Sequence, residues 1–271
     1  MHKLLMAGLF RLKKSIMFWL FIFFTIGIAG YTLFRHSVND GTPLDTLVNE
    51  FIVYIGLFIA IFVSIFVGKE YSEGIIRNKI IVGHSRANIY LSELIISIIT
   101  AVICEIMYLV MILTIGTLMY GKLQMSILQF GISILNTILI IIAYCSIFNF
   151  VTMLCSEITV STTICLLLFI TMFIVQGSLG LTVNSKKYIE HTFYDENGNR
   201  YVLSQEPNPN YPGDQKVKIA KAIYLLIPNA QANEVQNNSF ENTNQMPFYS
   251  ISLIIVVNIA GIYLFSKKEL K

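Results

Sequence analysis

The residues best suited to chemistry lie in one short stretch, GKEYSEGIIRNKIIVGHSR, from Gly68 to Arg86. Although only 13% of the chain is Asp, Glu, Lys or Arg, these nineteen residues contain six of them. Opposite charges four positions apart can pair along one face of a helix, as Lys69–Glu73 and Glu73–Arg77 would. The six charged residues are Lys69, Glu70, Glu73, Arg77, Lys79 and Arg86.

Catalytic and metal-binding patterns do not occur in the sequence. The four histidines are scattered over different segments, and there is no H-E-x-x-H or G-x-S-x-G pattern. No G-x-x-x-x-G-K-[ST] loop occurs either, so the sequence offers no phosphate cradle for a nucleotide. The four cysteines lie in or beside apolar runs without a C-x-x-C pair, which indicates small buried hydrophobic residues. We expect no catalytic residue, metal or cofactor in this chain.

One carboxylate, Glu105, lies well inside an apolar run, where a charge is costly unless it is paired or protonated. Two interpretations stay open at this stage. Glu105, Asn136 and Asn149 line a substrate path or a dimer seam, or Glu105 makes a structural hydrogen bond to Asn136, Asn149 or Thr163.

The elements that position these residues are predicted to be membrane-spanning helices. The chain has 271 residues, of which 55% are hydrophobic, and a mean hydropathy of +0.67. A soluble domain usually carries about 25% charged residues, and the net charge of +3 gives no reason to expect nucleic-acid binding. A spanning helix needs about 20 apolar residues. Six runs meet or nearly meet this length: Ile16–Phe34, Leu47–Val67, Ile89–Met119, Leu128–Met153, Val160–Leu179 and Phe248–Phe265.

Basic residues in short connections mark the cytoplasmic side of a membrane protein. The N-terminal segment, the second connection and the C-terminal tail carry eleven of them, whereas the first and third connections carry two. This asymmetry predicts a multi-pass cell-membrane protein with both termini and the stretch from Gly68 to Arg86 in the cytoplasm. The eleven are Lys3, Arg11, Lys13, Lys14, Lys69, Arg77, Lys79, Arg86, Lys267, Lys268 and Lys271, and the two are Arg35 and Lys122.

We therefore expect one all-α membrane domain over residues 1–271. Residues 1–14 place leucines at helical spacing among basic residues, which predicts an amphipathic helix on the inner leaflet, with basic side chains including Arg11 on lipid phosphates. Residues 16–179 form five spans, with the charged segment 69–86 between the second and third. Residues 180–247 form an extracellular segment, residues 248–265 the sixth span, and residues 266–271 a cytoplasmic tail.

The extracellular segment is predicted to be small and of α+β type. Asn197-Gly198 stands between aromatic and β-branched residues, which is a strong signal for a β-hairpin. A helix is predicted from Asp214, as its N-cap, to a stop at Pro228, with apolar residues along one stripe. The Asn-rich residues that follow Pro228 are predicted to form a loop.

The charged segment itself is predicted to contain a short amphipathic helix displayed to the cytosol. Ser72 is a candidate N-cap for it, Gly83 suits its C-terminus, and Ser85 suits the start of the third span. The sequence IIRNKIIV within it is an apolar run that requires a partner surface. The alternative is a solvated, positively charged loop with no further role.

The same stretch, KEYSEGIIRNKIIVGHSR, resembles the coupling segment between the second and third spans of type-2 ATP-binding-cassette (ABC) transporter permeases. The pattern E-Y-x-x-G-[TI]-x-[RK] is common there in that family, and Glu70, Tyr71, Gly74, Ile75 and Arg77 match it, with Ile75 where Thr is frequent. The following SRANIYLSELI resembles the family's entry into the third span. The layout of basic first helix, six spans, large outer segment and KK tail extends the resemblance to the whole chain.

The resemblance implies an assembly and a function. Such permeases pair, as identical copies or paralogues, and each pair binds two cytoplasmic ATPase subunits that hold ATP and Mg. The segment between spans two and three is the family's coupling helix, and the first helix is its elbow helix. The expected function is export of an amphipathic or hydrophobic peptide, lipid or drug-like substrate, with no enzyme activity in this chain. The residues expected to couple to the ATPase are Glu70, Tyr71, Gly74, Arg77, Gly83 and Arg86.

Other functional classes stay open on the sequence alone. A secondary transporter usually shows more charge within its spans or paired broken helices. A membrane-embedded enzyme requires catalytic pairs at membrane depth, and Glu105 is the one clear carboxylate there. A non-transporting anchor or sensor subunit is compatible with everything above.

Overall fold

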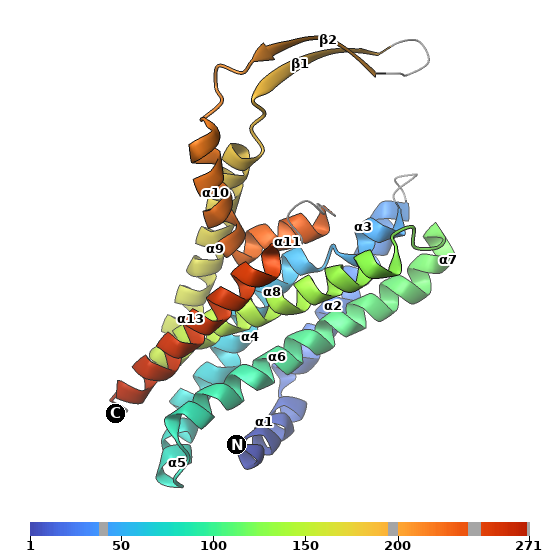
Figure 1. Cartoon of the computed structure of the whole chain (residues 1–271). Coiled ribbons are helices and arrows are strands. Elements are labelled where there is room, and N and C mark those ends of the chain that lie inside the picture. Colours follow the sequence, from blue (N-terminus) through green and yellow to red (C-terminus); the bar gives the residue numbers. More distant parts are fainter. Residues whose placement is uncertain (38–42, 195–199, 238–244, 270–271) are drawn as a thin grey trace.

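The computed structural model describes residues 1–37, 43–194, 200–237 and 245–269. It is a bundle of long helices with one β-hairpin (Figure 1). The helices are α1 (His2–Lys14), α2 (Ile16–Ser37), α3 (Leu44–Val48), α4 (Ile52–Ser72), α5 (Ile75–Ile81), α6 (Arg86–Met111), the π-helix η1 (Ile112–Gly116), α7 (Thr117–Tyr120), α8 (Ile127–Leu154), α9 (Ile158–Val183), α10 (Asp214–Leu226), α11 (Pro228–Gln236) and α13 (Met246–Lys267), and the strands are β1 (Tyr188–Tyr194) and β2 (Arg200–Pro207).

Six helical segments are long and apolar enough to cross a membrane, which confirms the prediction of an all-α membrane protein with six such helices. The third is the longest at 35 residues, because α6 continues through η1 into α7. A π-helical turn inside a long helix is a local widening of the backbone spiral. The six segments are Ile16–His36, Leu44–Ser72, Arg86–Tyr120, Ile127–Leu154, Ile158–Val183 and Met246–Lys267.

The bundle has two distinct ends. The N-terminus with α1, the short helix α5 and the C-terminal end of α13 lie together at one end, which we name the termini end (Figure 1). The hairpin and α10 lie at the opposite end, which we name the hairpin end. The first and last described residues of the chain thus lie at the same end of the bundle (Figure 1).

Helices α4 and α8 form the centre of the bundle. Of the most apolar stretch of each, 67% is buried, whereas the corresponding values are 11% for α9 and 17% for α13. The α4–α8 contact is close at Gly56, where a β-carbon would stand 2.6 Å from the ring of Tyr144. The outward faces of α9 and α13 are apolar, and none of the described residues covers them.

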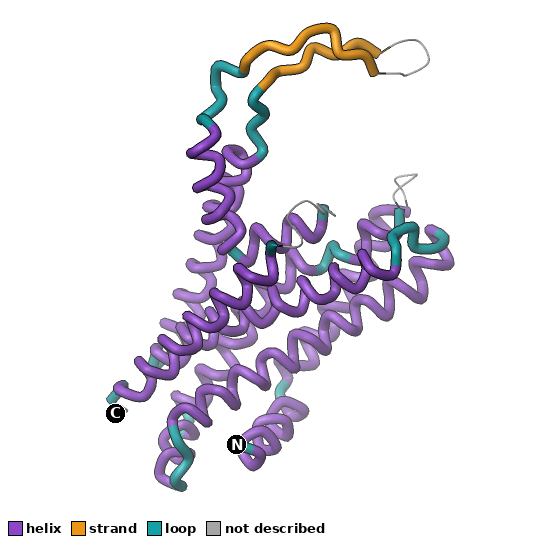
Figure 2. Tube along the Cα trace, viewed as in Figure 1, coloured by secondary structure: helices purple, strands orange, loops and turns teal. Residues whose placement is uncertain are grey.

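The hairpin extends away from the bundle (Figure 2). β1 and β2 pair antiparallel from Tyr188 opposite Pro207 to Tyr194 opposite Arg200, with a register shift between His191 and Thr192. The predicted hairpin is thus confirmed in its strands, while its predicted turn at Asn197-Gly198 lies outside the described residues.

The prediction of a loop after Pro228 was wrong for residues 229–236, because they form the helix α11, while residues 238–244 of the predicted loop lie outside the described residues. Proline is favoured in the first turn of a helix, where its missing N–H is not needed, so it starts α11 as well as ending α10. The small residues Ala230 and Ala232 are buried against the bundle, and Gln231 bonds the carbonyl of Leu225 and the hydroxyl of Ser250. Packing and hydrogen bonds to other helices therefore stabilise a helix whose polar composition is typical of a loop.

The packing at Gly56 predicts that Gly56→Ala destabilises the protein by about 1–3 kcal/mol, because the added methyl overlaps the Tyr144 ring. Gly131→Ala in α8 is the control, since no atom lies within 4 Å of its β-carbon position and alanine is the better helix former. Thermal unfolding in detergent measures both. Equal unfolding temperatures for the two variants would contradict the close α4–α8 contact.

Candidate functional site

Four ionised side chains meet at the termini end, and we name them the charge cluster: Arg11, Glu70, Lys79 and Glu93. Each comes from a different helix, namely α1, α4, α5 and α6. The cluster therefore joins the N-terminal helix, the ends of two spans and the short helix between them.

The charge cluster is a closed ring of ion pairs. Glu70 binds both Arg11 and Lys79, and the Lys79 ammonium lies 2.6 and 2.7 Å from its two oxygens. Glu93 also binds both cations, at 2.8 Å from Lys79 Nζ and 2.9 Å from Arg11 Nη2. The Arg11 guanidinium also lies 3.8 Å from the ring centroid of Phe66, a cation–π contact. Two positive and two negative charges balance.

Burial makes this balance important. The side chains of Glu70 and Glu93 are 2% and 1% exposed, and that of Lys79 is 12% exposed. Burial lowers the pKa of Lys79 below its usual value, while attraction to Glu93 acts in the opposite direction. Removing water from a charge costs several kcal/mol, which only close partners offset. Each member of the charge cluster therefore needs the other three in place.

The chain bends sharply on both sides of α5. Gly74 has φ +66° and Gly83 has φ +96°, values that side chains with a β-carbon rarely adopt. At the end of α5, the N–H groups of Gly83 and His84 donate to the carbonyls of Ile80 and Lys79, which is a Schellman motif. Ser85 then caps α6 by accepting from the N–H of Asn88. The prediction that Gly83 ends the short helix and Ser85 caps the third span is confirmed.

The predicted charge pairing along one helix was wrong. α4 runs through Ser72, so Ser72 does not cap the short helix, and the left-handed Gly74 separates Lys69 and Glu73 from Arg77. Because the backbone turns at Glu73–Gly74, the three residues share no helical face. Lys79, later in α5, instead pairs with Glu70 and Glu93 in the charge cluster.

A second set of contacts fixes the C-terminal end of α13 nearby. Arg86 donates to the backbone carbonyls of Phe265 and Lys268, the first at 3.0 Å. Lys268 donates to the carbonyls of Met153 and Cys155 and lies 4.2 Å from the ring centroid of Tyr71, whose hydroxyl also donates to Met153. Arg86 and Tyr71 thus bind this protein's own backbone.

One surface of α5 stays open to solvent. Ile81 and Val82 are 72% and 76% exposed, and Arg77 and Asn78 beside them are also exposed. We name these four residues the exposed α5 surface. Of the predicted coupling residues, Arg77 belongs to it, Gly74 and Gly83 shape the turns around it, and the carboxylate of Glu70 is buried behind it.

The residues predicted inside the membrane lie in other parts of the bundle. Glu105 is 7% exposed, about 18 Å along α6 from Glu93 at 1.5 Å per residue, and its Oε2 has no hydrogen-bond partner among the described residues. Asn149 is buried and donates to the carbonyl of Tyr90 at 3.4 Å, and Asn136 is 1% exposed. Thr163 donates to the carbonyl of Thr159. The structure does not join these residues to the charge cluster.

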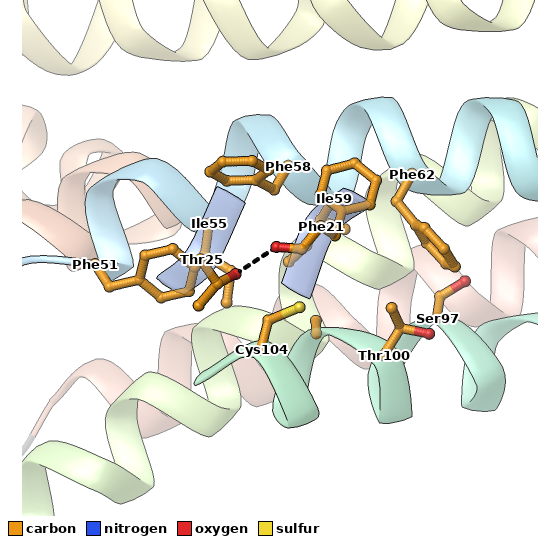
Figure 3. Close-up of a pocket in the computed structure, with 11 residues that line it drawn as sticks. Phe21, Thr25, Phe51, Ile55, Phe58, Ile59, Phe62, Ser97, Thr100 and Cys104 are labelled. Atoms are coloured by element: carbon orange, nitrogen blue, oxygen red, sulfur yellow. Dashed lines mark hydrogen bonds between the residues drawn. The ribbon is translucent and has the colours of Figure 1, made fainter. Parts of the chain in front are cut away.

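An apolar pocket lies between α2, α4 and α6 (Figure 3). Its cavity measures about 20 Å³, roughly the space of one water molecule. Its hydroxyls are bonded within their own helices: Thr25 to Phe21, Ser97 to Glu93 and Thr100 to Ile96. We interpret this pocket as a packing gap among aromatic rings, because it presents no free polar group to a ligand.

Three members of the charge cluster were not predicted as site residues: Arg11, Lys79 and Glu93. Arg11 was expected on lipid phosphates, but it points into the protein. The signal was its position seven residues after Leu4, on the same stripe as the buried Leu4, Gly8 and Leu12. No such local signal marks Lys79 and Glu93, because their partners are distant in the sequence.

No protein-family model matches this chain, and no curated protein matches it.

The charge cluster predicts that Glu93→Gln costs about 3–5 kcal/mol of stability, because it leaves two buried cations with one carboxylate. Adding Lys79→Gln removes one charge of each sign and should restore part of the loss. The control is Lys187→Gln, which breaks the exposed ion pair with Asp214 and should change nothing measurable. Denaturant unfolding in detergent compares the variants. Equal stability of Glu93→Gln and Lys187→Gln would contradict the role given to the cluster.

Proposed function

We propose that this chain is the membrane subunit of an ABC transporter, an exporter in which α5 is the coupling helix and separate ATPase subunits supply the energy. The substrate class expected for few charges within the spans is amphipathic or hydrophobic: a peptide, a lipid or a drug-like compound. The proposal also includes a second permease copy or paralogue and two ATPases on the side of α5.

The observation that carries the proposal is the construction around α5. A helix of seven residues is bent out of the chain by two left-handed glycines and exposes Ile81 and Val82 at its tip. Exposed apolar residues next to Arg77 and Asn78 form a surface suited to a protein groove. At the same time Lys79 reaches from the inner side of α5 to carboxylates on two spans.

This arrangement suits the transmission of force. A push on α5 reaches α4 and α6 through Lys79, and α1 through the carboxylates that Lys79 shares with Arg11. Because breaking the ring leaves unpaired buried charge, the four elements move together more easily than they separate. The exposed apolar faces of α9 and α13 provide surfaces for lipid and for a second copy.

The proposed orientation predicts that Val82→Cys reacts with a membrane-impermeant maleimide only from the cytoplasmic side, and Lys187→Cys only from outside. Both positions are exposed, and they lie at opposite ends of the bundle. The background carries Cys155→Ser, since the other native cysteines are buried. Labelling of Val82→Cys in intact cells would overturn the orientation and the coupling role together.

The proposed coupling predicts that Ile81→Glu with Val82→Glu abolishes co-purification with, and stimulation of, a phosphate-loop ATPase encoded beside this chain. Charge at the exposed α5 surface opposes burial in an apolar groove. Ile127→Glu is the control, because Ile127 is 93% exposed and begins α8, directly after α7, which ends the 35-residue span that starts beside α5. Unchanged ATPase binding and stimulation in the double variant would refute the assignment.

A further inference from the structure

A second polar site lies at the hairpin end, beneath α11, and we propose that it binds a small uncharged ligand carrying a carboxamide. This site is a cavity of about 180 Å³ between α4, α8, α9 and α11, which we name the α11 chamber. The binding proposal is argued from the geometry of this cavity and does not depend on coupling to an ATPase. Its lining residues are Val53, Tyr144, Phe173, Gln176, Gly177, Asn229, Ala232 and Asn233.

Two deeply buried polar atoms of the chamber have no partner among the described residues. They are the Tyr144 hydroxyl and Asn229 Oδ1, from residues that are 0% and 6% exposed. Buried polar groups in proteins nearly always have a hydrogen-bond partner, and leaving one unpaired costs about 1–3 kcal/mol. Nothing in the described part of the chain bonds either group, so a ligand in the chamber would supply both missing partners.

The Tyr144 ring is held in place independently of its hydroxyl. It stacks on Phe148 with centroids 6.1 Å apart and planes at 4°, and it contacts Phe169 at 6.5 Å. The hydroxyl therefore stays at the chamber wall whether or not it is bonded. Asn229 is fixed by its place in the first turn of α11.

The lining defines the chemistry of the ligand. No lining residue is charged, and the neighbouring carboxylate of Glu234 accepts from the Tyr224 hydroxyl at 3.3 Å. Asn229 Oδ1 requires a donor, and the Tyr144 hydroxyl can donate or accept. A carboxamide supplies both a donor and an acceptor without charge. Phe173 and Val53 supply an apolar wall for an attached ring or short chain.

The chamber is large enough for a ligand with one ring. An apolar cavity of about 150 Å³ in another protein accommodates benzene. The chamber reaches the exposed face of α9 at Phe173 and Gly177, so a ligand has a way in. A β-carbon at Gly177 would meet no atom within 4 Å, which makes this position suitable for filling the chamber.

The experiment measures binding of radiolabelled benzamide to the full chain in nanodiscs by equilibrium dialysis, with empty nanodiscs subtracted. Benzoate serves as the charged probe of the same shape. Tyr144→Phe removes only the hydroxyl, and Gly177→Leu fills the space. The matched controls are Tyr31→Phe, at an exposed tyrosine, and Gly131→Leu, at another helical glycine with open space around it.

We expect saturable benzamide binding that Tyr144→Phe weakens about twofold to tenfold, the effect of one neutral hydrogen bond. Gly177→Leu should abolish it, the two controls should bind as the wild type does, and benzoate should not bind. The proposal is overturned if benzamide shows no saturable binding, if benzoate binds equally well, or if Gly177→Leu binds as the wild type does. Gly177→Leu decides the matter even where Tyr144→Phe does not fold.

Discussion

The arrangement of the termini end depends on one constraint, which is that four charges are removed from water together. Glu70 and Glu93 are almost fully buried, and each touches both Arg11 and Lys79. Such a ring tolerates no missing member, because an unpaired buried charge is far more costly than an absent pair. It therefore fixes the relative positions of α1, α4, α5 and α6, although α5 alone is too short to be stable.

The bundle places polar groups at its two ends in contrasting ways. At the termini end the charges are paired with one another, while Arg77, Asn78, Ile81 and Val82 on α5 stay exposed. At the hairpin end the α11 chamber has uncharged groups, two of them without a partner in the described part of the chain. The first arrangement resists being pulled apart, and the second has room for a ligand. Between them α4 runs the length of the core and contributes to both.

The sequence by itself determined the spans, the hairpin strands and two helix ends from local pattern, although local pattern also gave the wrong charge pairing around Gly74 and the wrong loop after Pro228. Continuous apolar runs predicted the six spans, aromatic and β-branched residues around a turn signal predicted the hairpin strands, and Gly83 and Ser85 predicted the ends of neighbouring helices. These features were predictable because the residues that decide them lie within a few positions of one another.

Only the tertiary structure decided which side chains meet. Arg11 binds carboxylates 59 and 82 positions away in the sequence. The spacing of residues along a helix or strand does not predict a contact over such a separation. The helix α11 escaped prediction for the same reason, since its polar residues are buried only because α4, α8 and α9 surround them. The energy of a buried polar residue depends on hydrogen-bond and ion-pair partners from distant segments. Local sequence does not identify these partners, because only the folded structure brings them together.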